Sequence, residues 1–135
     1  MSLLIKKIIG RSEKIYFPEI DLKLNAKIDT GAWRTSIHVD GFEIKDDKLH
    51  FWIGDKTNLF IFEDYKETIV KNSFGQTQKR YIISLKMKMG KKKYTLLASL
   101  TDRSGMKYSC LIGRRFLKRY GFLVDVTKKN INDKS

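Results

Sequence analysis

The sequence predicts a small all-β domain, built as a closed barrel with one short helix near its C-terminal end. Three observations favour this fold class. Short segments rich in Ile, Leu, Phe, Tyr and Val are separated by turn signals along most of the chain, a pattern typical of barrels and sandwiches. Apolar residues at helical spacing occur in one segment only. A single proline, and no Gly/Ser-rich tract, leave no sign of a linker between domains.

Most of the chain is predicted to form strands. Arg80–Met89 alternates most clearly, and a turn at Gly90 leads from it into Lys93–Leu100 as a hairpin. The apolar face of the first of these strands comprises Tyr81, Ile83, Leu85, Met87 and Met89. The other predicted strands are Leu3–Ile9, Leu22–Ile28, Thr35–Val39, Leu49–Ile53, Leu59–Phe62, Thr68–Lys71 and Phe122–Val126.

Arg114–Tyr120 is the predicted helix. Phe116, Leu117 and Tyr120 lie on one side of it and basic residues on the other. Gly121 follows as a C-cap, and the chain then returns to strand.

The 135 residues fit one domain with one hydrophobic core. We assign residues 1–127 to it and expect the polar C-terminal tail 128–135 to be frayed. No apolar run approaches the ~20 residues that cross a bilayer, and Met1–Ile9 is too short for a signal peptide. The lone cysteine, Cys110, excludes an intrachain disulfide. These features predict a cytoplasmic protein that does not contact a membrane.

The formal net charge is +13, from 28 Lys and Arg against 15 Asp and Glu. Such a field attracts anionic partners, namely nucleic acid, acidic peptides or acidic membranes. A lysine-rich surface also keeps a small protein soluble without any partner. Charge alone therefore does not choose among these explanations.

One short motif carries chemistry. Asp29, Thr30, Gly31 and Ala32 follow an apolar strand, so an acid stands at the end of a strand with a hydroxyl and a glycine directly after it. An aspartic peptidase needs this order, because the carboxylate lies at the floor of a cleft, Thr30 hydrogen-bonds across a pair of loops, and Gly31 brings its N–H close to the carboxylate. A surface turn has a similar composition. Since the chain has no internal repeat, the second half of such a site must come from another copy, in a homodimer.

Two carboxylates in contact share one proton in such a site. The ionised one acts as a base on water, while the protonated one polarises the scissile carbonyl and then protonates the leaving amine. Their titration is a property of the pair.

Lys71–Lys79 is a polar segment between two predicted strands. It has Gly75 near its centre and shows no apolar periodicity. The pattern predicts a hairpin tip, which is either an ordinary exposed turn or a mobile flap over a site.

A second motif, 111–114 (Leu-Ile-Gly-Arg), lies about 80 residues after Asp29 and directly before the predicted helix. Retroviral-type aspartic proteases carry an apolar-apolar-Gly-Arg segment before their single helix, beside the catalytic loop. The order of the elements agrees as well, so the chain resembles a retropepsin-like domain. Retropepsin dimers interlace terminal strands, which makes Leu3–Ile9 and Phe122–Val126 the predicted dimer edge.

The whole chain is similar to a bacterial and archaeal group of retropepsin-like proteins known as RimK-linked or ATP-dependent zinc proteases. The resemblance runs from about residue 5 to residue 127. The matching positions are 26–32, 35–36, 38, 75, 80–81, 100–104, 106, 111–114, 116–117 and 122–125.

This resemblance implies an aspartic-type peptidase linked to ATP-grasp ligases that append glutamates to a ribosomal protein. The implied substrate is an oligo-glutamate tail or a similar acidic peptide, which the net charge also favours. Catalysis is assigned to Asp29, Thr30 and Gly31. The predicted substrate-binding residues are Ala32, Trp33, Gly75, Arg80, Arg103 and Arg114, with Arg115 as a further arginine able to bind carboxylates. Each arginine would pair either with a substrate carboxylate or with a structural acid such as Asp102 or Asp125.

The sequence departs from the viral pattern directly after the motif. Viral relatives have an acid soon after the motif's alanine, and this acid pairs with the Gly-Arg arginine. Here Trp33 and Arg34 follow Ala32, so Arg114 needs another partner. Trp33 fits either a substrate platform or a plug of the barrel.

The group's label mentions zinc and ATP, but the sequence predicts neither cofactor. Catalytic zinc usually takes three protein ligands, and the chain offers His38, His50 and Cys110 without a His-Glu-x-x-His helix. We expect a structural or hydrogen-bonding role for His38. Since no Gly-rich phosphate loop is present, any ATP dependence would belong to a partner ligase.

Two other functions stay open. A basic barrel with Trp33, Trp52, Phe51 and Tyr81 suits an RNA- or ribosome-binding module that works by base stacking and phosphate contact. A catalytically silent member of the group would act only as an adaptor of the ligase.

Overall fold

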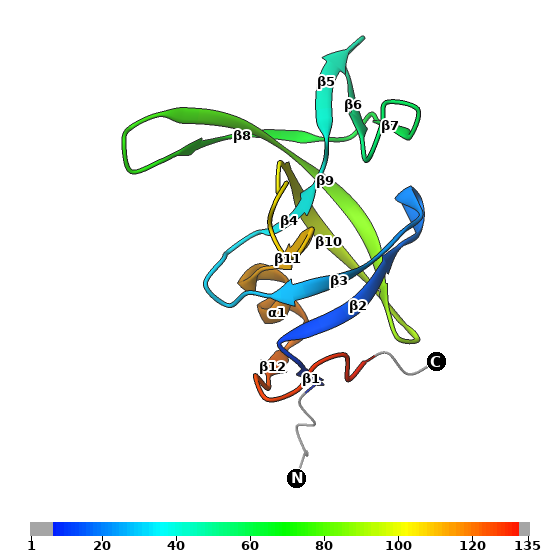
Figure 1. Ribbon diagram of the computed structural model, residues 1–135, viewed down its shortest axis with the longest axis vertical. Coiled ribbons are helices and arrows are strands. Elements are labelled where there is room, and N and C mark those ends of the chain that lie inside the picture. Colours follow the sequence, from blue (N-terminus) through cyan, green and yellow to red (C-terminus); the bar gives the residue numbers. More distant parts are fainter. Residues whose placement is uncertain (1–6, 133–135) are drawn as a thin grey trace.

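The computed structural model describes residues 7–132 of the chain (Figure 1). The strands are β1 (Lys7–Ile9), β2 (Ser12–Phe17), β3 (Leu22–Ile28), β4 (Thr35–His38), β5 (Gly41–Lys45), β6 (Lys48–Trp52), β7 (Leu59–Phe62), β8 (Lys66–Lys71), β9 (Thr77–Met89), β10 (Lys92–Thr101), β11 (Cys110–Ile112) and β12 (Phe122–Val124). A short 3₁₀ helix, η1 (Pro18–Ile20), follows β2, and the α-helix is α1 (Arg114–Tyr120). The predicted all-β class with one helix is confirmed. No helix among the described residues is long and apolar enough to span a membrane.

The barrel closes through the strand order β2, β3, β11, β4, β10 and β9. The ring is complete because β9 pairs with β10 on one side and with β2 on the other. The predicted hairpin between β9 and β10 is confirmed, with Leu85 opposite Leu96. Ile83, Leu85, Met87 and Met89 of β9 are all buried. Each such side chain contributes about 1.5–3 kcal/mol on burial, so this alternating strand anchors the core.

A second sheet, β5–β6–β7, stands at one end of the barrel and forms the upper part of Figure 1. Leu49 and Phe51 of β6 are fully buried. Phe51 packs against Phe60 and Phe62 with ring centroids 5.4 and 5.5 Å apart. Phe51 is therefore a core residue, and its ring is not accessible for stacking on a nucleic-acid base.

Three strands, β2, β5 and β11, are not predicted by the sequence pattern. β2 begins with Ser12 and Glu13, which are polar and yet buried, so the expected alternation fails. β5 is exposed along most of its length, and β11 has only 3 residues. The predicted strands that fall within the described residues are confirmed with shifts of a few residues at their ends, whereas residues 3–6 lie outside the described part of the chain.

Residues 128–132 pack against β2, so the prediction of a frayed tail is wrong for them. Asn130 N–H donates to the Ser12 carbonyl at 2.8 Å. Asn132 N–H and Nδ2–H donate to the buried carboxylate of Glu13, each at 3.0 Å. The segment lacks apolar periodicity, and these polar partners hold it in place instead. Residues 133–135 lie outside the described part of the chain.

Candidate active site

The Asp29 loop joins β3 to β4, two strands that do not pair with each other. β11 lies between them, parallel to β3 and antiparallel to β4 (Figure 1). Ile112 is in register with Ile28, so the end of β11 reaches the base of the loop. Asp29 N–H donates to the Ile112 carbonyl at 2.9 Å. A segment from late in the chain therefore fixes where the Asp29 loop begins.

The start of α1 fixes the other half of the loop. Arg114 N–H donates to the Ala32 carbonyl at 2.7 Å, and Arg115 N–H donates to the Trp33 carbonyl at 3.0 Å. The first N–H groups of a helix have no partner within the helix. Here the Asp29 loop supplies carbonyls to two of them, which joins helix and loop into one unit.

Gly113 makes this close approach possible. A Cβ at this position would lie 2.6 Å from the carbonyl carbon and oxygen of Arg34, which are backbone atoms with little freedom to move. Gly113 N–H also donates to the buried Thr35 hydroxyl at 3.2 Å. Gly113 and Thr35 are positioning residues whose roles are not evident from the sequence, although both belong to the segments that carry the resemblance.

The Asp29 carboxylate is half-buried, whereas Thr30 and Gly31 are exposed. Gly31 N–H donates to Asp29 Oδ1 at 3.0 Å, which confirms the contact predicted for this glycine. No other described residue donates a hydrogen bond to this carboxylate, and none bonds the Thr30 hydroxyl. The loop's backbone is therefore fixed, while the side chains of Asp29 and Thr30 keep free hydrogen-bonding capacity.

Arg114 contacts two partners in place of the acid that pairs with the corresponding arginine in viral relatives. Its Nη1 donates to the Thr30 carbonyl at 3.2 Å, and its guanidinium lies 5.6 Å from the centre of the Trp33 ring. A cation over an indole face contributes about 0.5–1 kcal/mol at an exposed site. Trp33 is 45% exposed, so the alternative of a barrel plug is wrong. The structure thus brings Arg114, Trp33 and the Asp29 loop together.

Gly75 and Arg80 lie on the hairpin of β8 and β9. Gly75 has φ +81°, a conformation that favours glycine, and Asn72 Oδ1 accepts the N–H groups of Phe74 and Gln76 at 2.9 and 3.0 Å. Phe74 at the tip is 88% exposed. In Figure 1 the hairpin and the β3–β4 loop extend toward the same side of the barrel. The predicted hairpin tip is confirmed, and flap motion stays a prediction.

Arg103 lies at the opposite end of β11 from Asp29. Its Nε donates to the Tyr108 carbonyl at 2.9 Å, which closes the loop before β11. Its N–H donates to His38 Nδ1 at 2.8 Å. Within the described residues Arg103 therefore makes structural contacts, and a role in substrate binding stays a prediction.

His38 uses both ring nitrogens in hydrogen bonds. Because Nδ1 accepts from Arg103, Nε2 carries the proton and donates to Asp40 Oδ1 at 2.9 Å. The hydrogen-bonding role predicted for His38 is confirmed. The N–H of Gly54 and then the ring of His38 hold the pKa of the Asp40 carboxyl below its usual value. A zinc ion does not fit here, since neither nitrogen offers a free lone pair.

Residues 7–132 contain no group of three or more His, Cys, Asp or Glu side chains able to hold a metal ion. Cys110 is fully buried on β11, and this burial raises the pKa of its thiol to about 12. A thiolate nucleophile is therefore not available at neutral pH. Among the described side chains, Asp29 is the group whose setting suits hydrolytic chemistry.

A groove of about 310 Å³ runs from Thr30 and Arg114 along α1 to β12. Leu123, at its far end, is 50% exposed, and Ile8, its register partner on β1, is 39% exposed. One face of the molecule therefore carries both the Asp29 loop and exposed apolar side chains of the terminal strands.

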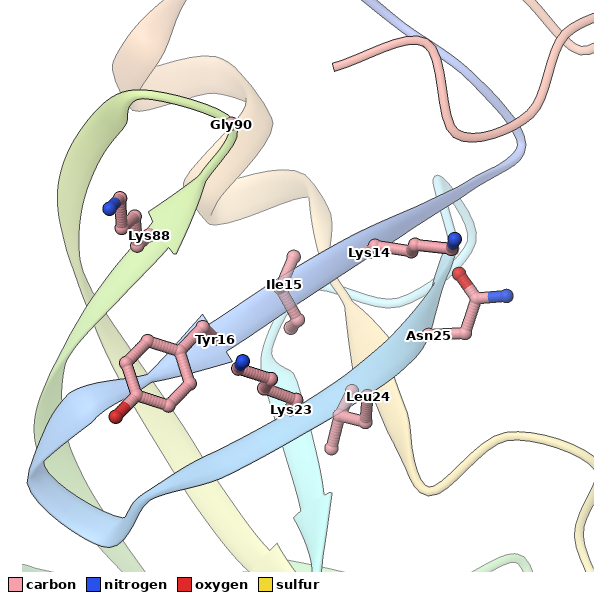
Figure 2. Close-up of a pocket in the computed structure, with 8 residues that line it drawn as sticks. All are labelled: Lys14, Ile15, Tyr16, Lys23, Leu24, Asn25, Lys88 and Gly90. Atoms are coloured by element: carbon pink, nitrogen blue, oxygen red, sulfur yellow. The ribbon is translucent and has the colours of Figure 1, made fainter. Parts of the chain in front are cut away.

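Another hollow, of about 490 Å³, lies on β2, β3 and the β9–β10 turn (Figure 2). Lysines of β2, β3 and β9 line it together with Ile15 and Leu24. These lysines are Lys14, Lys23 and Lys88. No residue of the Asp29 loop lines this hollow, so it takes no part in the chemistry considered for that loop.

Known proteins are similar to this chain in sequence and in fold. A protein described as a probable α-L-glutamate ligase, from Desulfotalea psychrophila, is 31% identical over 120 aligned residues, and the match covers 81% of this chain and 26% of that protein. A protein of the same description from Shewanella pealeana is 27% identical, and the match again covers 81% of this chain and 26% of that protein. The chain thus spans about a quarter of the length of these curated relatives. A solved structure of a Legionella pneumophila protein of unknown function is similar with a TM-score of 0.69 and 28% identity, covering 93% of this chain and 98% of that one.

A family profile described as RimB-like, retropepsin-like aspartic endopeptidase RimB, matches residues 8–135. The match spans the barrel, the Asp29 loop, β11 and α1, which are the elements that build the site. The chain therefore belongs to the RimB-like family of retropepsin-like aspartic endopeptidases.

Proposed function

We propose that this protein is a cytoplasmic aspartic peptidase, active as a homodimer, that hydrolyses acidic peptides of the oligo-glutamate type. One observation carries the proposal. The Asp29 carboxylate is half-buried at the end of β3, in a loop held by β11 and α1, with one oxygen oriented by Gly31 N–H. A preorganised carboxylate with a free oxygen is what acid–base hydrolysis of an amide requires.

The chemistry needs two such carboxylates. In a dimer, the Asp29 side chains of the two copies would share one proton. The ionised one takes a proton from a water molecule, whose oxygen attacks the scissile carbonyl carbon. The protonated one hydrogen-bonds the carbonyl oxygen, and a proton then passes to the leaving nitrogen as the C–N bond breaks. The exposed Thr30 hydroxyl is available to hydrogen-bond the loop of the second copy.

The apolar face beside the loop supports the homodimer. Ile8 and Leu123 are paired on β1 and β12, and both are exposed. Val126, just after β12, is 70% exposed. Leu123 also lines the groove that begins at Thr30. Joining two copies through this face would bury the apolar side chains and bring the two Asp29 loops together.

The charge supports an acidic substrate. The net charge of +13 attracts polyanions over distances of about a Debye length. Arg34, Arg114 and Arg115 flank the Asp29 loop, and each is exposed. A run of glutamates bound at this loop would meet positive charge close to the scissile bond.

The relatives suggest the biological setting. Their matching quarter belongs to longer proteins named as probable α-L-glutamate ligases. A peptidase domain associated with such a ligase would act on the glutamates that the ligase adds, for example on a ribosomal protein. The same observation favours a second candidate function, in which the domain only tethers the ligase to its target.

The test is cleavage of an N-acetylated poly-α-glutamate peptide, followed by mass spectrometry, with wild-type protein and Asp29→Asn. We expect the variant to lose at least about 1,000-fold in rate, because it removes both the acid and the base. Asp64→Asn, at an exposed aspartate between β7 and β8, is the matched control and should cleave normally. Cleavage by Asp29→Asn at the wild-type rate would rule out the aspartic mechanism.

The dimer has its own test, by analytical ultracentrifugation. Leu123→Glu places a charge on the proposed interface, and we expect a monomer without peptidase activity. Ile61→Glu is the control, since Ile61 is 53% exposed on β7, away from that face. A wild-type dimer that cleaves no glutamate peptide would favour the tethering function, and a fully active Leu123→Glu monomer would contradict the shared site.

A further inference from the structure

A small cavity of about 40 Å³ lies between α1, β10 and the end of the Asp29 loop. Arg34, Arg115 and Arg119 line it, and its lining contains no acidic residue. None of these three arginines forms an ion pair within residues 7–132. Like charges grouped around one cavity repel one another, and a bound anion would relieve this repulsion.

Ser99 is the second observation that points to a ligand. Its side chain lines the cavity from β10, and the residue is only 3% exposed. Its Oγ nevertheless has no hydrogen-bond partner among the described residues. Buried hydroxyls are nearly always hydrogen-bonded because an unpaired one costs free energy. A ligand oxygen in the cavity would supply the missing partner.

We propose that this cavity binds a glutamate side-chain carboxylate of the substrate, an inference that rests on the peptidase function proposed above. Arginine presents paired N–H groups that match the two oxygens of a carboxylate. Ser99 would donate its O–H to one of the same oxygens. A cavity needs about 10–15 Å³ of space to hold one water, so one of about 40 Å³ admits the end of a side chain and is too small for a nucleobase.

The cavity lies within reach of the reacting bond. Arg34 follows Asp29 by five residues, so their Cα atoms are at most about 18 Å apart. Arg115 is tied to the same loop through its N–H bond to the Trp33 carbonyl. A bound extended peptide advances about 3.3 Å per residue. The substrate glutamate whose side chain binds in the cavity would therefore lie within about five or six residues of the scissile bond.

Binding is measured separately from turnover, on Asp29→Asn protein. The probe is N-acetyl hexaglutamate amide, with calorimetry for affinity and amide NMR shifts for location. We expect shifts at Arg34, Ser99 and Arg115. The double variant Arg34→Met/Arg115→Met should bind at least about 10-fold more weakly, the loss expected for charged hydrogen bonds.

Two further variants isolate the cavity. The double variant Lys45→Met/Lys66→Met removes the same charge from exposed positions on β5 and β8 and should change affinity less than about twofold. Ser99→Ala should weaken binding about threefold or more while leaving the melting temperature unchanged or higher, since it removes an unpaired buried hydroxyl. A purely structural Ser99 would instead lower the melting temperature without affecting affinity.

Several results would overturn the inference. Glutamate-induced shifts at Lys14, Lys23 and Lys88 in place of the cavity would move the anion site to the other hollow. Binding of a phosphopeptide at the cavity, with no binding of hexaglutamate there, would make it a phosphate site. If wild-type protein cleaves the peptide and the Arg34→Met/Arg115→Met variant does so with the same kcat/KM, the cavity is not a substrate-binding site. The peptidase function would remain intact. A different result, binding of hexaglutamate at the cavity of the Asp29→Asn protein with no cleavage by wild-type protein, would reject the peptidase function and leave the carboxylate site intact.

Discussion

Glu13 and Asp29 are carboxylates on neighbouring strands of the barrel, and their surroundings differ. Glu13 on β2 is fully buried and accepts three hydrogen bonds, from Gly10 N–H at 2.8 Å and from Asn132 N–H and Nδ2–H at 3.0 Å. Asp29, directly after β3, is half-buried and accepts one, from Gly31 N–H. A buried carboxylate with a full set of donors holds structure together. A carboxylate with a free oxygen remains available for reaction.

Both regions are closed by a segment from late in the chain, but the late segments bind different atoms. Residues 128–132 reach the side chain of Glu13. β11 and the start of α1 reach only the backbone of the Asp29 loop, at Asp29 N–H and at the carbonyls of Ala32 and Trp33. The fold thus fixes the position of Asp29 through the backbone and leaves its carboxylate free to bind other groups. A preorganised site is built in this way.

The largest expected effect separates activity from stability at Asp29. We expect Asp29→Asn to lose the peptidase activity proposed here by about 1,000-fold or more while its free energy of unfolding changes by less than about 0.5 kcal/mol. Urea unfolding followed by Trp fluorescence checks the second part. A large loss of stability would show that Asp29 is a structural carboxylate like Glu13.

Gly113→Ala tests the backbone attachment of the loop. The new Cβ would lie 2.6 Å from backbone atoms of Arg34, so we expect a loss of about 3 kcal/mol in unfolding free energy. Thr35→Ser keeps the hydroxyl that accepts from Gly113 N–H and should cost about 1 kcal/mol, for one buried methyl group. Equal stability of Gly113→Ala and wild type would mean that the loop and α1 are not in close contact.

Glu13→Gln tests the other carboxylate. Gln presents an NH₂ group toward donors on Gly10 and Asn132, so at least one donor is left unpaired, at a cost of about 1–3 kcal/mol. The activity per folded molecule should stay at the wild-type level. Glu43→Gln, at an exposed glutamate on β5, is the control and should leave stability within about 0.5 kcal/mol. An inactive but stable Glu13→Gln would reverse the contrast between the two sites.

The smallest effect concerns pH. The hydrogen bonds from Gly54 and His38 lower the pKa of Asp40 from its usual value of 3.8. A group with a lowered folded pKa stabilises the fold while it is ionised, and this contribution is lost as pH falls through the folded pKa. Thermal melts from pH 5 downward should therefore show a loss of stability that begins near pH 4. Asp40→Asn should show a shallower decline, and an identical decline would exclude Asp40 as a contributor.

The sequence predicts those parts of the fold that depend on local pattern. The alternation of apolar and polar residues predicts the β9–β10 hairpin, and the apolar side of Arg114–Tyr120 predicts α1. The contact between Gly31 N–H and the Asp29 carboxylate is predicted because such a carboxylate needs a backbone donor close to it. The role of Glu13 could not be predicted, because its partner Asn132 is 119 residues away. The grouping of Arg34, Arg115 and Arg119 could not be predicted either, because it depends on how α1 packs on the barrel. The viral pattern left Arg114 without an acid, and only the structure shows Trp33 as its partner.

The insertion of β11 between β3 and β4 has a consequence for biosynthesis. The strands on either side of the Asp29 loop are made early, but the strand that lies between them is translated about 70 residues later. Contacts of such large sequence separation form late because a long loop must close first. We expect the Asp29 loop to remain without its native shape until residues 110–115 have left the ribosome. Until then a growing chain would lack the arrangement of Asp29 on which the proposed peptidase activity depends.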